Sequence, residues 1–127
     1  MTIFKEKTAI VTGGASGIGE ELCFSLGAQE AIVVVADIDI EGAGKVAATI
    51  RKRGGQASAV RVDVSRQEDI RSVIDKTKEN YGRLDYVFNN AGIHIFGEFK
   101  DMPHDYWKRM IDINLWGLSM EPPMRIM

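Results

Sequence analysis

The 127-residue sequence contains a single cysteine, Cys23. One cysteine cannot form an internal disulfide, and it cannot supply half of a Cys-x-x-Cys metal site. The two histidines, His94 and His104, also lack the spacing of metal ligands, so no metal site is predicted. Because disulfides are typical of oxidising compartments, their exclusion here predicts a cytoplasmic location.

A basic surplus and long apolar runs are missing as well. Lys and Arg number 16 against 18 Asp and Glu, which gives a net charge of −2, so no nucleic-acid partner is expected. The longest apolar run, Ala31 to Ala36, is far too short for a membrane span, and the charged first ten residues do not resemble a signal peptide. With 45% apolar and 27% charged residues, the composition is typical of one small globular domain.

Apolar spacing predicts alternating strands and helices. The expected strands are short apolar runs, and the expected helices carry apolar residues three or four positions apart. The predicted strands are residues 8–11, 31–36, 57–64 and 84–88, and the predicted helices are 17–26, 39–53, 65–81 and 103–118. Ser65 and Glu68 have capping-box spacing, which predicts that Ser65 starts the third helix. This order indicates an α/β fold, a doubly wound parallel sheet with helices on both faces.

A glycine-rich segment follows the first predicted strand directly. Gly13, Gly17 and Gly19 have the spacing GxxxGxG. Glycines let backbone N–H groups approach a pyrophosphate, and the N-terminus of the next helix adds positive potential. The alternative is a tight turn that binds nothing, but the position between a strand and a helix favours the phosphate site.

Carboxylates follow the second and third predicted strands. Asp37 lies 18 residues after Gly19, near the spacing of an acid that binds both hydroxyls of an adenosine ribose. It could instead start the next helix, a role for which Asp39 is the other candidate. Asp63 could contact an adenine edge, or it could be a polar strand end before Ser65.

Asn114 lies on the apolar face of the last predicted helix, seven residues after Trp107. A buried amide must find partners or it costs about 1–3 kcal/mol. The side chain could bond the backbone in the core, or it could hold an active-site water or a catalytic side chain. The residues alone leave both alternatives open.

Several of these segments together resemble the classical short-chain dehydrogenase/reductase family. They are TGGASGIG (Thr12 to Gly19), the Asp37 position, Asp63-Val64, NNAG (Asn89 to Gly92) and DINLWG around Asn114. The resemblance implies an NAD(P)-dependent oxidoreductase with a Rossmann-type domain and a small alcohol or ketone substrate. It makes Asn114 the asparagine of the family's Asn-Ser-Tyr-Lys catalytic group. It also implies cofactor contacts from Gly13, Ser16, Gly17, Ile18, Gly19, Asp37, Ile38, Asp63, Val64, Asn90, Ala91 and Gly92.

The expected dinucleotide is NAD rather than NADP. Asp37 would repel the 2′-phosphate of NADP, and no Lys or Arg occurs within residues 13–19 to offset that repulsion. A methyltransferase with a similar glycine loop is an alternative, but the NNAG segment and the GxxxGxG spacing argue against it.

The sequence departs from the family after Asn114. None of its three tyrosines is followed by a lysine four residues later, so the family's Tyr-xxx-Lys pair is missing. We interpret residues 1–118 as the N-terminal part of an NAD(P)-binding Rossmann domain, truncated after about four strands, and residues 119–127 as a divergent tail. The alternative to an incomplete dehydrogenase is an inactive truncated product that binds NAD or a partner chain only.

The predicted sheet has the strand order 3-2-1-4, with the fourth strand as an exposed edge. An apolar edge of this kind invites pairing with another chain, so self-association is expected.

Overall fold

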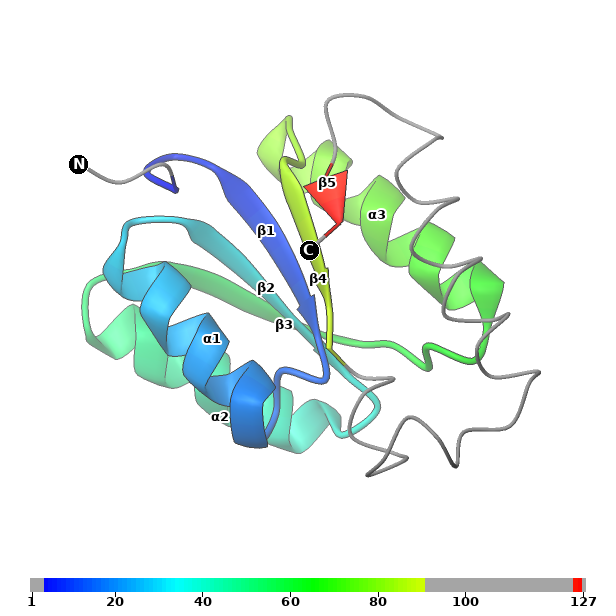
Figure 1. Cartoon of the computed structure of the whole chain (residues 1–127), viewed down its shortest axis with the longest axis horizontal. Helices are drawn as coiled ribbons and strands as arrows, with labels where there is room; N and C mark the ends of the chain where they lie inside the picture. The colour runs from blue at the N-terminus through cyan, green and yellow to red at the C-terminus, as the bar shows by residue number, and fades with distance from the viewer. Residues whose placement is uncertain (1–3, 91–124, 127) are drawn as a thin grey trace, which may run out of the picture.

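A computed structural model describes residues 4–90 and 125–126, and Figure 1 shows how strands and helices alternate along the chain. The elements are β1 (Thr8–Thr12), α1 (Gly17–Ala28), β2 (Ile32–Asp37), α2 (Ile40–Lys52), β3 (Gln56–Arg61), α3 (Gln67–Tyr81), β4 (Tyr86–Asn89) and β5 (Arg125–Ile126). The predicted α/β fold is confirmed. The predicted helix 103–118 lies outside the described residues.

The sheet is parallel, with the strand order β3-β2-β1-β4-β5. The predicted order of the first four strands is therefore confirmed. The expectation of an exposed fourth strand is wrong over part of its length, because Tyr86 and Val87 pair with Arg125 and Ile126. The free N–H and C=O groups of an edge strand favour pairing with an extended segment, and β5 supplies one.

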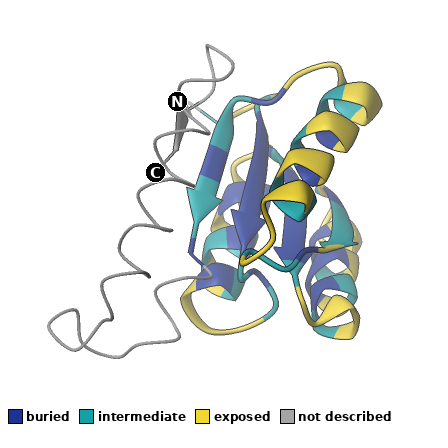
Figure 2. Cartoon of the chain, turned by 90° about the vertical axis from the view of Figure 1, so that its right-hand side faces the viewer, coloured by how far each residue is buried: buried dark blue, intermediate teal, exposed yellow. Residues whose placement is uncertain are grey.

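The core has two layers, one on each face of the sheet (Figure 1). All five residues of β1 are buried, as expected for a central strand covered on both sides. Ala9 and Val11 pack in the layer that contains α1 and α2, whereas Ile10 packs in the layer that contains α3. Figure 2 shows the result: the strands are largely buried, and the helices expose only their outer faces.

The segment between β3 and α3 differs from the sequence-based prediction. Strand β3 ends at Arg61, and α3 begins at Gln67 with Arg66 as its N-cap residue, so Ser65 does not start the helix. The capping box is not formed, because Ser65 donates its N–H (2.9 Å) and its hydroxyl (2.6 Å) to Asp63 Oδ1. Such a local side-chain turn competes with helix capping for the same serine.

Helix α3 ends at Tyr81, the residue at which the predicted third helix ends. Gly82 follows the helix in the left-handed conformation, with φ of 76°. Among the described residues, no helix is long and apolar enough to cross a lipid bilayer.

Candidate functional site

The polar segments singled out in the sequence meet at one edge of the sheet. Thr12 lies opposite Ala36 of β2 and Asn89 of β4 in the parallel register. The segments that follow these three strands therefore leave the sheet side by side. In open α/β sheets this edge, at the carboxyl ends of the strands, is where ligands bind.

The glycine loop, residues 13–19, runs from the end of β1 into the first turn of α1, and its first residue, Gly13, lies against Gly19 in that turn. Gly13 and Gly17 have φ of 65° and 59°, a region that side chains with a Cβ rarely adopt. A Cβ on Gly19 would lie 2.0 Å from the carbonyl oxygen of Gly13. Glycine at position 19 is thus required by the close approach of the two backbone segments, and the loop conformation is built into the sequence.

The N-terminus of α1 points out of this loop. Within the described part of the chain, the N-cap residue Ser16 makes no side-chain hydrogen bond to the helix. The first backbone N–H groups of α1 are therefore left for another acceptor, and the helix dipole makes their surroundings positive. An anionic group such as a pyrophosphate fits this arrangement.

A hydrogen-bonded clamp joins the glycine loop to the end of β4. Asn90 is buried, and its Nδ2 donates to the Gly13 carbonyl oxygen at 3.3 Å. Its backbone N–H donates to Thr12 Oγ1 at 3.0 Å. The Thr12 hydroxyl also lies 3.1 Å from Asn89 Oδ1 and 3.3 Å from the Phe88 carbonyl oxygen. The clamp fixes where the glycine loop begins.

Asp37 connects the glycine loop with the end of β2. Its Oδ2 accepts the N–H of Ala15 at 3.0 Å, and its Oδ1 accepts the N–H of Asp39 at 3.0 Å. The half-buried carboxylate has lone pairs left for further donors. Of the two candidates for starting α2, Asp39 takes that role, because it is the N-cap residue and accepts the Gly42 N–H at 3.0 Å.

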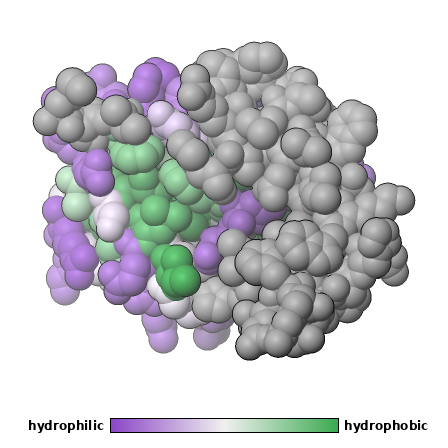
Figure 3. Space-filling view, viewed as in Figure 1, coloured by the Kyte–Doolittle hydropathy of each residue, from purple (hydrophilic) through white to green (hydrophobic). Residues whose placement is uncertain are grey.

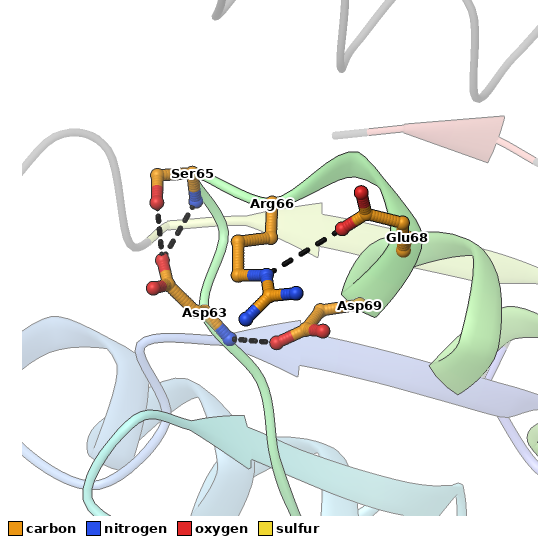
Figure 4. A network of polar contacts seen from close by, with 5 residues as sticks. All are labelled: Asp63, Ser65, Arg66, Glu68 and Asp69. Atoms are coloured by element: carbon orange, nitrogen blue, oxygen red, sulfur yellow. Dashed lines mark hydrogen bonds and ion pairs between the residues drawn. The ribbon is translucent and has the colours of Figure 1, made fainter.

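Asp63 lies in a polar network after β3 (Figure 4). Its carboxylate accepts both donors of Ser65, and its backbone N–H donates to Asp69 Oδ2 at 3.0 Å. The Ser65 hydrogen bonds hold the pKa of Asp63 below its ordinary value, so the carboxylate stays ionised near neutral pH. Neighbouring Val64 is half-buried and packs against the layer under α3.

Large exposed apolar side chains stand near the same edge. Ile18 is 67% exposed, Ile38 is 56% exposed and Ile40 is 42% exposed. Ile18 belongs to the first turn of α1, Ile38 follows Asp37 directly, and Ile40 is the first residue of α2. Figure 3 shows an apolar area over α1 and the strands next to it. Exposed apolar groups beside convergent polar ones are typical of small-molecule sites.

Cys23 is a buried packing residue behind the glycine loop. A Cβ on Gly14 would lie 3.1 Å from its sulfur. Burial, followed by the nearby Glu20 charge, raises the pKa of the Cys23 thiol to about 12. The thiol therefore stays protonated and is not suited to act as a nucleophile.

Some predicted site residues lie outside the described residues: Ala91, Gly92 and Asn114. Two contributions to the site were not predicted from the sequence, namely the Thr12 hydroxyl and the Ala15 N–H. A backbone N–H carries no sequence signal. The position of Thr12 directly before the glycine loop was the one sequence signal for these contributions.

The chain is similar in sequence to known dehydrogenases. The short chain dehydrogenase family profile matches residues 7–120. Meso-2,3-butanediol dehydrogenase from Serratia marcescens is 36% identical over 91% of this chain and 45% of its own length. Glucose 1-dehydrogenase 2 from Bacillus subtilis is 39% identical over 87% of this chain and 44% of its own length.

A solved structure gives the same result for the fold. The crystal structure of hydroxysteroid dehydrogenase from Escherichia coli superposes with a TM-score of 0.72 at 34% identity, covering 88% of this chain and 46% of that one. The chain thus spans less than half the length of these relatives.

Proposed function

The chain belongs to the short-chain dehydrogenase family, and from this premise we propose that it binds NAD and serves hydride transfer between nicotinamide and a small alcohol or carbonyl substrate. The observation that carries the proposal is the link between the glycine loop and Asp37, in which Ala15 N–H donates to Asp37 Oδ2 at 3.0 Å. This bond fixes a pyrophosphate site and a ribose-binding acid relative to each other. A nicotinamide dinucleotide needs both groups at a set distance.

The glycine loop would hold the pyrophosphate. Its backbone, together with the N-terminus of α1, offers N–H donors where side chains are absent. We assign Gly13, Ser16, Gly17, Ile18 and Gly19 to this contact. The Gly13 position depends on the Asn90 clamp, which supports a positioning role for Asn90 beside its expected contact with the cofactor.

Asp37 would accept the hydroxyls of the adenosine ribose, and this favours NAD over NADP. A carboxylate and a phosphate about 4 Å apart repel by roughly 4 kcal/mol at an effective dielectric constant of 20, before screening. Ile38 offers no charge to offset this repulsion, and neither does the glycine loop. Asp63 and Val64 would border the adenine, since they follow β3, the neighbour of β2 in the sheet.

Hydride chemistry would come from the bound nicotinamide, which exchanges hydride with the substrate carbon. Asn90, Ala91 and Gly92 would border the adenosine-side and nicotinamide riboses, and Asn114 would be the catalytic asparagine. The family's Tyr-xxx-Lys pair transfers the proton of the substrate oxygen, and these 127 residues contain no such pair. The second candidate function is therefore binding of NAD, or of a partner chain, without turnover.

Isothermal titration with NAD, NADP and S-adenosylmethionine tests the proposed function. We expect binding of NAD, weaker binding of NADP, and none of S-adenosylmethionine. Asp37→Ser should weaken NAD and improve NADP, whereas Asp75→Asn on α3, on the other face of the sheet, should change neither. Equal or tighter binding of NADP to the unaltered chain would refute the NAD assignment. Tight binding of S-adenosylmethionine would refute the oxidoreductase assignment.

A further inference from the structure

The Ser65 hydroxyl is bonded to Asp63, although neither the local turn nor helix α3 requires this bond. The N–H and the hydroxyl of Ser65 both donate to Asp63 Oδ1, at 2.9 Å and 2.6 Å (Figure 4). The N–H bond alone forms the turn, and every residue type except proline supplies that N–H. Capping of α3 does not need the hydroxyl either, because Arg66 is the N-cap residue.

The two Ser65 bonds fix one oxygen of the Asp63 carboxylate and leave the other for a ligand. Within residues 4–90 and 125–126, Asp63 Oδ2 accepts no hydrogen bond. The main chain is held as well, since the Asp63 N–H donates to Asp69 Oδ2 at 3.0 Å. The Ser65 hydrogen bonds keep the pKa of Asp63 below its ordinary value, so the carboxylate is ionised near neutral pH. An ionised carboxylate offers acceptors and no donor.

Asp63 is also held close to Asp37, the acid assigned to the adenosine ribose. The carbonyl oxygen of Asp37 accepts the N–H of Val62 at 3.0 Å, and Asp63 is the next residue. The segments that follow β2 and β3 therefore stay joined beyond the ends of the two strands. Because the adenine is bonded to the ribose, a residue that contacts the base has to be held close to the residue that binds the sugar. Asp63 meets this requirement.

We propose that the Ser65 hydroxyl is a positioning group for Asp63, through which the site prefers a 6-amino purine over a 6-oxo purine; this inference rests on the proposed function. The 6-amino group of adenine is a hydrogen-bond donor, whereas a 6-oxo group is an acceptor. The free oxygen of Asp63 accepts a hydrogen bond from the first and repels the second. A carboxylate that turns freely would avoid this repulsion, so the preference depends on Ser65 holding Asp63 in place.

The test compares NAD with nicotinamide hypoxanthine dinucleotide, in which a 6-oxo group replaces the 6-amino group of the purine. Isothermal titration would give both dissociation constants for the unaltered chain, Ser65→Ala, Ser65→Thr and Asp63→Asn. Ser72→Ala serves as the matched control, because it removes an exposed serine hydroxyl within α3. Circular dichroism would verify that each variant is folded.

The expected result is a change in the ratio of the two dissociation constants. The unaltered chain should bind NAD about 10-fold more tightly than the hypoxanthine analogue. Ser65→Ala should lower this preference to about 2- to 3-fold, and Ser65→Thr should keep it, because threonine also carries a hydroxyl. Asp63→Asn should abolish the preference, since an amide offers a donor as well as an acceptor. Ser72→Ala should leave the ratio within about 1.5-fold of the unaltered chain.

Failure of the inference is distinguishable from failure of the proposed function. If Ser65→Ala weakens both dinucleotides by the same factor, Ser65 only stabilises the turn, and the inference is refuted while the dinucleotide site stands. The same holds if Ser65→Ala keeps the full preference, or if the unaltered chain binds both dinucleotides equally well. If the unaltered chain binds neither dinucleotide, the proposed function itself is wrong, and the inference falls with it.

Discussion

Replacing Gly19 by alanine tests how tightly the glycine loop is held against α1. A Cβ at this position would lie 2.0 Å from the Gly13 carbonyl oxygen and 2.6 Å from Asn90 Nδ2, whereas ordinary contacts begin at 3.4 Å. The loop would have to retreat by more than about 1 Å, and overpacking of this kind costs about 1–3 kcal/mol. The retreat would also stretch the Asn90 hydrogen bond to Gly13, which is already 3.3 Å long.

Two measurements follow for Gly19→Ala. Urea denaturation should show a free energy of unfolding lower by about 1–3 kcal/mol. NAD affinity should fall at least about tenfold, since the displaced loop no longer presents its N–H groups correctly. The matched control is Gly44→Ala in α2, where a Cβ would meet nothing within 4 Å among the described residues. This control should gain about 0.5–1 kcal/mol, because alanine favours helices over glycine. A Gly19→Ala chain with unchanged stability and NAD affinity would refute the reasoning.

Three further predictions concern the strands and the chain as a whole. Thr12→Val should cost about 0.5–1.5 kcal/mol, because it removes the hydrogen bonds that the Thr12 hydroxyl makes with the Asn90 N–H, Asn89 Oδ1 and the Phe88 carbonyl oxygen. Thr8→Val should be neutral or stabilising, since Thr8 Oγ1 is buried without a hydrogen-bond partner among the described residues. Denaturation of both variants would compare them, and equal losses would contradict the expectation. Burial raises the pKa of Asp85, but hydrogen bonds from Arg83 and from the Thr8 N–H outweigh it and hold the pKa below its ordinary value. Asp85 therefore stabilises the fold above about pH 4 and loses that contribution as pH falls through its folded-state pKa. In Asp85→Asn, the free energy of unfolding should fall less steeply as pH is lowered. An acid dependence identical to that of the unaltered chain would contradict the role of Asp85. A polypeptide of these 127 residues alone should reduce no NAD above background across a panel of alcohols. General acid–base catalysis typically raises a reaction rate about 10²–10⁴-fold, and these residues lack the Tyr-xxx-Lys pair that would supply it. Turnover that is lost on changing Tyr106 to Phe would contradict this and reveal a different proton-transfer group.

The sequence was sufficient to predict most of the fold, because the deciding signals are local. The β-branched run at residues 31–36 is typical of a buried parallel strand, and β2 occupies Ile32–Asp37. Asp39 was one of two candidates for the start of α2, because few residue types cap helices well. The alternation of these elements then left few topologies to consider.

Predictions failed where two local interactions compete for one group. Ser65 matches the capping-box pattern, but Asp63 two residues earlier accepts the Ser65 N–H, which the Glu68 carboxylate would accept in a capping box. Sequence spacing does not rank these two bonds. The pairing of β4 with β5 also depends on a long-range contact between Val87 and Ile126, for which no local pattern exists.

Within the candidate site, spacing predicted the glycine loop and the acid, but not the contacts between them. The Ala15 N–H bond to Asp37 spans 22 residues, and the Asn90 bond to Gly13 spans 77. Such bonds depend on strand register, which the sequence constrains only through its apolar pattern. The chemistry of the site could thus be proposed from the sequence, whereas its rigidity required the structure.

Mapping NAD binding by NMR on the isotopically labelled chain tests the central claim most directly. The account predicts saturable shifts of backbone amides in residues 13–19, with further shifts at Asp37, Ile38 and Asn90, and none along the outer face of α3. The Ala15 amide is the most informative single probe, because its hydrogen bond to Asp37 connects the pyrophosphate and ribose contacts. Shifts confined to α3, or none at saturating NAD, would contradict the assignment of this sheet edge as a dinucleotide site.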